Sequence, residues 1–251
     1  KRNYKVLVNI INKEEQYQEI RSEFKNRIVA GGIFLGFENG SPLLTKLAEE
    51  DYRMVLLDQE ENFYSKKKNL IFADIDDENA AFNVVKTLVG KGHTKIAHIR
   101  HTAKRLSSIS RYEGYMRGLK EFSLALNLNY VAIGKGTEKG SYKAMKEIIN
   151  NSKDDLPTAV FAGTDLMASY AIKAIQDKGL SVPEDISVIG YDNTSLAKYS
   201  SPSISSVDVP IGKISEFAVE NLINMIEGKE FEREYKFQTE IILRDSVKEI
   251  I

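Results

Sequence analysis

The chain has 251 residues with 35 Lys or Arg against 36 Asp or Glu, so its formal net charge is −1. This near-neutrality argues against a chain-wide electrostatic footprint for nucleic acid. The absence of Cys excludes disulfides, thiolate nucleophiles and Cys-based metal sites, and three His leave little for a metal centre or a catalytic triad. No apolar run is long enough to span a membrane. We therefore expect a soluble, cytoplasmic protein with no metal or cofactor.

Short apolar runs alternate with amphipathic stretches along the whole chain. The candidate strands, in chain order, are Lys5–Ile10, Gly32–Leu35, Arg53–Leu57, Leu70–Ala73, Lys95–Ile99, Ala159–Ala162, Ile186–Gly190 and Ile241–Leu243. Most are continuously apolar, as expected of strands that are buried on both faces. The candidate helices, with apolar residues at helical spacing, are Asp77–Gly90, Ser110–Phe122, Asp165–Lys178 and Gly212–Glu227. This alternation predicts an α/β fold with parallel sheets.

Polar residues follow several of these strands. Ligands of open α/β sheets bind beyond the carboxyl ends of the strands, so these residues are candidates for a binding site. Asp, Asn, Ser and Thr are also common helix caps and turn formers, and Asp77 and Asp165 fit that structural role best. Asp192 and Arg111 fit it less well. Arg is no N-cap, and the Ser-rich segment before it is interpreted as a polar recognition loop.

Motifs for common enzyme chemistries are missing from the sequence. It contains neither the G-x-G-x-x-G nor the P-loop pattern, which counts against dinucleotide binding and nucleotide hydrolysis. We also find no nucleophile-base pair, and catalysis would have to rely on carboxylates alone. We therefore expect no enzyme and assign no catalytic residue.

Several segments, in matching order and spacing, resemble one known family. They are Gly92–Ala97, Ser110–Tyr115, Pro157–Ala168, Val182–Asn193, Pro202–Val207 and Leu243–Ser246. Together they make the chain from about Asp51 to Val247 similar to the LacI/GalR family of bacterial transcription regulators. The similarity is to the effector-binding core of that family, which has a periplasmic-binding-protein-like fold.

The resemblance implies two doubly wound, parallel-sheet subdomains of periplasmic-binding-protein type I, joined by three hinge crossings. The expected N-terminal subdomain comprises residues 1–100 and 208–235, and the C-terminal subdomain comprises residues 101–207 and 236–251. A small molecule would be held in the cleft between them.

Residue by residue, the resemblance implies that Arg111 and Asp192 grip this effector. Arg donors opposite a carboxylate suit vicinal hydroxyls or the edge of a heterocycle. Four further residues match pocket positions of the family, namely Phe161, Asp58, Asp77 and Thr164. The position of Phe161 stacks on the ligand in some members, and Thr164 stands where Asn or Asp is common.

The sequence departs from the family pattern at its N-terminal side. These 251 residues contain no helix-turn-helix and no hinge helix. Tyr4–Asn9 resembles the second strand of the family core, so we expect the first strand and first helix of the core to be missing and interpret the sequence as a fragment. Loss of a central strand should expose apolar edges.

The sequence thus predicts the effector-sensing and dimerisation core of a LacI/GalR-type transcriptional regulator, most simply a repressor. The expected effector is a sugar or related metabolite. The expected partners are a second copy of the chain and, only through an N-terminal domain absent from these residues, operator DNA. The alternative is a solute-binding protein of a sugar transporter, which shares the fold.

Overall fold

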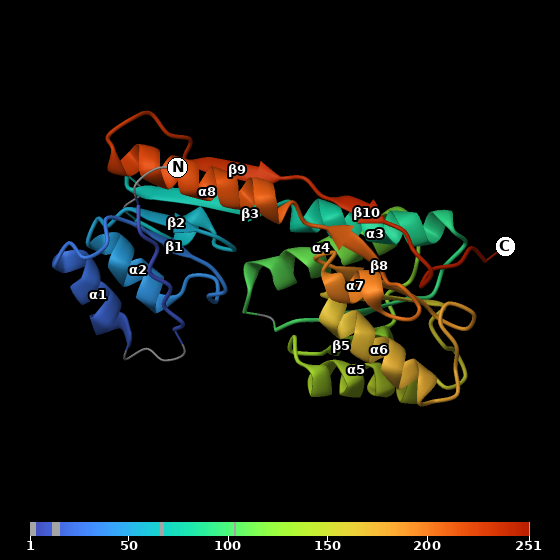
Figure 1. Cartoon of the computed structure of the whole chain (residues 1–251). Coiled ribbons are helices and arrows are strands. Elements are labelled where there is room, and N and C mark those ends of the chain that lie inside the picture. The colour runs from blue at the N-terminus through green and yellow to red at the C-terminus, as the bar shows by residue number, and fades with distance from the viewer. Residues whose placement is uncertain (1–3, 12–15, 66–67, 103, 251) are drawn as a thin grey trace.

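A computed structural model of the chain describes residues 4–11, 16–65, 68–102 and 104–250. Within these ranges the protein forms two α/β subdomains that lie side by side (Figure 1). Each has its own mainly parallel sheet, so the predicted α/β class is confirmed.

The first subdomain contains a four-stranded parallel sheet in the order β1-β2-β3-β9. Its strands are β1 (Gly32–Phe34), β2 (Met54–Leu56), β3 (Leu70–Ile75) and β9 (Glu234–Phe237). Helices α1 (Tyr17–Lys25) and α2 (Pro42–Glu49) cover one face, and α8 (Ile211–Ile226) covers the other. Successive residues of a strand point to opposite faces, so Met54 and Leu56 pack with α1 and α2 while Val55 packs with α8.

The second subdomain contains a six-stranded sheet in the order β10-β8-β7-β6-β4-β5, in which only β10 runs antiparallel to its neighbour. In this order the strands are Glu240–Ile242, Ser205–Asp208, Ser187–Tyr191, Ala159–Ala162, Ile96–Arg100 and Val131–Ile133. One face carries α3 (Asp77–Gly90) and α4 (Leu106–Glu121), and the other carries α5 (Glu138–Asn151), α6 (Asp165–Gln176) and the short α7 (Ser195–Tyr199). Single 3₁₀ turns lie at Glu61–Phe63 and Leu128–Tyr130.

The expected first boundary between the subdomains, at residue 100, is wrong. Strand β4 pairs with β6 and β5 in the six-stranded sheet, and α3 packs against α4. The chain therefore crosses between β3 and α3, and it crosses again after Asp208 and after Phe237. Apolar periodicity identifies a strand but not the sheet to which it belongs, which explains the error. Residues 1–3 and 251 of the expected division lie outside the described residues.

The predicted strand Lys5–Ile10 is also wrong, because residues 4–11 form no regular structure. Val6, Val8 and Ile10 are largely exposed. Strand β1 is an edge of its sheet, and an apolar groove of about 380 Å³ lies between it and residues 7–11. A segment forms a strand only when it pairs with another strand, and residues 4–11 do not pair with the edge strand β1.

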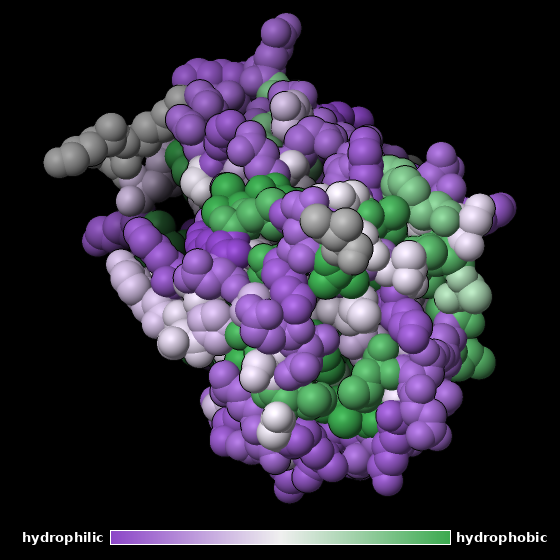
Figure 2. Space-filling view, turned by 90° about the vertical axis from the view of Figure 1, so that its right-hand side faces the viewer, coloured by the Kyte–Doolittle hydropathy of each residue, from purple (hydrophilic) through white to green (hydrophobic). Residues whose placement is uncertain are grey.

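Figure 1 shows the first subdomain at the left of the view and the second subdomain at the right. On the face of the second subdomain that Figure 2 presents, hydrophobic residues form separate patches among hydrophilic ones. Among the described helices none is both long and apolar enough to cross a membrane.

Candidate functional site

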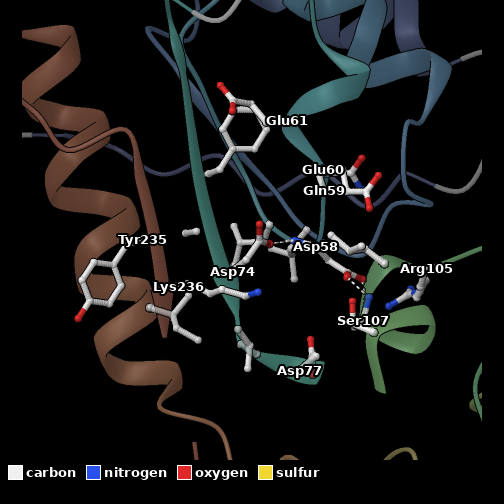
Figure 3. A pocket seen from close by; sticks show the side chains of 18 of the residues that line it. Asp58, Gln59, Glu60, Glu61, Asp74, Asp77, Arg105, Ser107, Tyr235 and Lys236 are labelled. Atoms are coloured by element: carbon white, nitrogen blue, oxygen red, sulfur yellow. Dashed lines mark hydrogen bonds between the residues drawn. The ribbon is translucent and has the colours of Figure 1, made fainter. Parts of the chain in front are cut away.

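The carboxyl ends of β2 and β3 open into a cavity of about 630 Å³ between the subdomains. Asp58 and Asp74 line it from the first subdomain, and Asp77 and Ser107 line it from the second (Figure 3). Arg111 of the second subdomain also lines it. Parallel strands bring their polar ends together at one edge, which is why residues from separate segments meet here. A volume of this size is typical of small-molecule sites.

Helix α4 begins earlier than predicted. The Ser-rich segment before Arg111, which we interpreted as a recognition loop, forms the first turns of this helix. Its N-cap, Arg105, supplies no side-chain hydrogen bond to the helix. The early N–H groups of a helix have no partner within the helix and need an external acceptor.

Asp58 supplies that acceptor from the other subdomain. Its Oδ1 accepts a hydrogen bond from the backbone N–H of Ser107 at 2.5 Å, and its Oδ2 accepts from the Ser107 hydroxyl at 3.0 Å. Burial raises the pKa of Asp58, while the bonds from Ser107 oppose the shift. Asp58, which was expected at a pocket position, therefore acts as a helix cap and joins the two subdomains.

Asp74, on β3, lies beside Asp58. Its Oδ1 accepts a hydrogen bond from the backbone N–H of Asp58 at 2.8 Å. Burial raises the pKa of Asp74 to about 7, and the nearby charges of Asp58 and Asp77 act in the same direction. The sequence analysis did not select this residue, which lies near the carboxyl end of β3.

Arg111 is held by a buried ion pair that differs from the expected clamp. Its Nε donates to Asp77 Oδ1 at 2.7 Å and its Nη1 donates to the Gly163 carbonyl at 2.6 Å. The guanidinium carbon lies 3.5 Å from the ring centroid of Tyr191, whose hydroxyl donates to the same Asp77 oxygen at 2.6 Å. Burial opposes the charge of Arg111, but Asp77 outweighs it and the pKa is raised.

The capping role favoured for Asp77 and Asp165 is wrong. Asp76 caps α3 by accepting from the Asn79 N–H, which leaves Asp77 free to pair with Arg111. Asp165 instead accepts bonds from Ser206 and Thr194.

A second cavity, of about 140 Å³, lies at the carboxyl ends of the six-stranded sheet. It is lined by His98, His101, Arg105, Ser107, Ser108, Arg111, Gly163, Thr164 and Asp192. Arg111, Arg105 and Ser107 line both cavities, so the first turns of α4 separate one from the other. The structure thus brings Arg111, Asp192 and Thr164 together as the sequence indicated.

Asp192 faces this cavity from the end of β7. Its backbone φ of 96° lies in the left-handed region, as does that of Asp58 at 61°. Such conformations are uncommon for residues other than Gly and tend to occur at functional sites. Burial raises the pKa of Asp192 to about 6, although Arg111 opposes the shift.

Two predicted residues have structural roles here. Phe161 is fully buried and lines neither cavity; its ring stacks on His98 with centroids 4.6 Å apart. Thr164 lines the small cavity and also caps α6, where its hydroxyl accepts from the Met167 N–H. Phe161 thus lies behind the small cavity and packs against His98, which lines it.

Sequence reasoning missed His98, His101, Arg105, Ser107 and Ser108. The last three lie in the segment that was interpreted as a loop, and His101 directly follows β4. His98 lies inside a strand, where the strand-end argument gives no signal. Only the pairing of β4 with β6 places it next to the cavity.

Comparisons with known proteins identify the family. Residues 85–247 match the periplasmic binding protein-like domain. The HTH-type transcriptional repressor PurR of Histophilus somni is 32% identical over 244 residues, which is 96% of this chain and 72% of that protein. PurR of Aliivibrio fischeri is 36% identical over 173 residues, 68% of this chain and 51% of that protein, so the chain spans about half of its length.

A solved structure agrees with these relatives. It is a sugar-binding transcriptional regulator of the LacI family from Escherichia coli, in complex with phosphate, with 27% identity and a TM-score of 0.81. The match covers 94% of this chain and 83% of that one. The chain therefore belongs to the LacI/GalR family of transcriptional regulators and corresponds to its periplasmic-binding-protein-like core.

Proposed function

We propose that this chain is the effector-sensing and dimerising core of a cytoplasmic transcriptional repressor that binds a small molecule, sugar-like in character, between its subdomains. The observation that carries the proposal is the pair of cavities at the carboxyl ends of both sheets, which share Arg111, Arg105 and Ser107 as walls. A ligand in this place touches both subdomains. It can therefore favour one arrangement of the subdomains over another.

The mechanism follows from the chain crossings. A ligand that bridges the subdomains favours the closed arrangement, and the crossings after Ile75, Asp208 and Phe237 absorb the rotation. In a homodimer this rotation changes the relative position of the elements that precede the two cores. Operator DNA would be bound by a domain upstream of residue 1, and the two PurR relatives support regulation over solute transport.

The polar groups of the site suit a neutral, hydroxyl-rich or heterocyclic ligand. Arg111 provides donors, while Asp192 and Asp58 provide acceptors. The sugar-binding relative from Escherichia coli supports the same class. No step in this function requires bond breaking, which agrees with relatives that are regulators and not enzymes.

Isothermal titration calorimetry tests the proposal with cellobiose, D-glucose, D-ribose, hypoxanthine, guanosine and fructose 6-phosphate. We expect one of these compounds to bind in a one-to-one complex. Asp192→Ala and Arg111→Ala should each abolish that binding, with folding checked by circular dichroism. Binding that is unchanged in both folded variants would show that the site lies elsewhere, and absence of binding by the whole panel would contradict the proposed ligand classes.

A further inference from the structure

Two buried polar atoms at the small cavity lack a hydrogen-bond partner. They are Nε2 of His98 and Oγ of Ser108, two of the four such side-chain atoms in the part of the chain that the structure describes. Both residues line the 140 Å³ cavity, and both are almost completely buried. A buried polar atom without a partner destabilises the folded protein, so two of them at one cavity need an explanation.

The hydrogen bonds of His98 fix its chemical form. Its Nδ1 lies 2.9 Å from the carbonyl oxygen of Phe161. A carbonyl only accepts, so Nδ1 carries the hydrogen and Nε2 presents a lone pair. Burial lowers the pKa of His98 to about 3, and the positive charges of Arg100 and Arg111 lower it further. The imidazole is therefore neutral at physiological pH.

The surroundings of His98 hold the ring in place. It stacks on Phe161 and lies 5.2 Å from the ring of Tyr115, centroid to centroid. Because Nδ1 is already used, the ring atom that remains for a ligand is Nε2. A rigid, neutral acceptor recognises a donor at one position, which gives geometric selectivity.

The charges around the small cavity select a neutral group. Asp192 and the lone pair of His98 disfavour an anion, while Arg111 and Arg105 disfavour a cation. The cavity is smaller than a complete small-molecule site, so it suits one end of a ligand whose remainder occupies the 630 Å³ cavity.

We propose that the small cavity is a specificity subsite in which Nε2 of His98 accepts a hydrogen bond from a neutral donor of the effector, a sugar O–H or a nucleobase N–H. Ser108 completes the subsite, since its hydroxyl can donate to or accept from the same group. This inference rests on the proposed function and adds to it the residues that select the inserted group.

The test uses whichever panel compound binds the wild-type protein. His98→Phe retains an aromatic ring against Phe161 but removes Nε2, and Ser108→Ala removes the second group with little change of volume. We expect each variant to bind about tenfold more weakly, the effect of losing one hydrogen bond. Ser152→Ala is the matched control, because Ser152 Oγ is also buried without a partner but lines neither cavity; its affinity should equal that of the wild type.

Nitrogen-15 NMR of the imidazole provides a measurement that does not depend on the variants folding. We expect a neutral His98 with hydrogen on Nδ1, and a shift of the Nε2 resonance when the compound is added. Sugars and nucleobases in the panel distinguish the O–H donor from the N–H donor.

The possible outcomes separate the two proposals. Unchanged affinity in both variants, a hydrogen on Nε2, or binding without a shift of Nε2 would each overturn the subsite while leaving the proposed function intact. Absence of binding to the wild-type protein by every panel compound would contradict the proposed function, and the subsite would fall with it.

Discussion

Asp58 of the first subdomain caps helix α4 of the second subdomain through Ser107. The carboxylate accepts both the backbone N–H and the hydroxyl of Ser107, at 2.5 and 3.0 Å. A helix cap normally comes from the residue that precedes the helix, and here Arg105 holds that position without a side-chain bond. This contact therefore couples the start of α4 to the first subdomain.

The coupling predicts that Asp58→Ala favours a more open arrangement. The variant should lose about 1 kcal/mol of unfolding free energy, the usual effect of removing a cap, and should show a larger radius of gyration by small-angle X-ray scattering. Thr137→Ala is the control, because Thr137 caps α5 within one subdomain by accepting the Gly140 N–H. It should lose similar stability without any expansion. Equal radii for Asp58→Ala and the wild type would show that the contact does not hold the cleft closed.

The Arg111–Asp77 pair predicts a large loss of stability when one partner is removed. Arg111→Ala leaves the Asp77 carboxylate buried beside the Tyr191 hydroxyl without its cation, and breaking a buried pair in this way costs about 3–5 kcal/mol. Urea denaturation measures the loss.

Arg117 offers a matched control, since it also joins α4 to α3. Its pair with Glu78 is about two-fifths exposed, so Arg117→Ala should cost less than about 1 kcal/mol. Equal losses for the two variants would mean that the Arg111 pair is solvated and not buried.

Asp74 predicts a dependence of stability on pH. Its pKa is raised from 3.8 to about 7, mainly by burial. Between these values the folded chain binds a proton that the unfolded chain has released, so the contribution of Asp74 to the unfolding free energy falls as pH rises from about 4 to 7. Asp74→Asn, which keeps an acceptor for the Asp58 N–H, should gain stability relative to the wild type at pH 8 but not at pH 5.

Urea denaturation at the two pH values checks this expectation, with Asp177→Asn as the control. A hydrogen bond from Lys173 lowers the pKa of Asp177, so its carboxylate is ionised at both pH values. The difference between this variant and the wild type should be the same at pH 5 and pH 8. A similarly constant difference for Asp74→Asn would contradict a raised pKa.

The sequence was sufficient for the fold class and for part of the site. Continuous apolar runs identified β6 and β7, and the residues at their ends, Thr164 and Asp192, line a cavity. The Ser-rich start of α4 was misread because Ser and Arg are weak signals for a helix whose cap comes from Asp58, far away in sequence. Such long-range contacts decide local structure but leave no local pattern. The same reason explains why the sequence alone did not find His98.

Gly114 lies on α4 three residues after Arg111, where the helix comes close to α3. A Cβ at this position would lie 2.0 Å from the carbonyl oxygen of Glu78, on the helix that carries Asp77. The absence of a side chain thus lets α4 approach α3 closely enough for Arg111, one turn earlier, to reach Asp77.

Gly114→Ala should therefore separate the helices and weaken the ion pair, even though Ala favours helices by about 1 kcal/mol over Gly. We expect lower unfolding free energy and weaker effector binding, measured by urea denaturation and calorimetry. Gly90→Ala, in α3, is the control, because a Cβ there meets no atom within 4 Å. It should be neutral or stabilising and leave binding unchanged. A Gly114→Ala protein as stable as the Gly90→Ala protein would show that the helices can move apart without cost, and that close approach at Gly114 does not position Arg111.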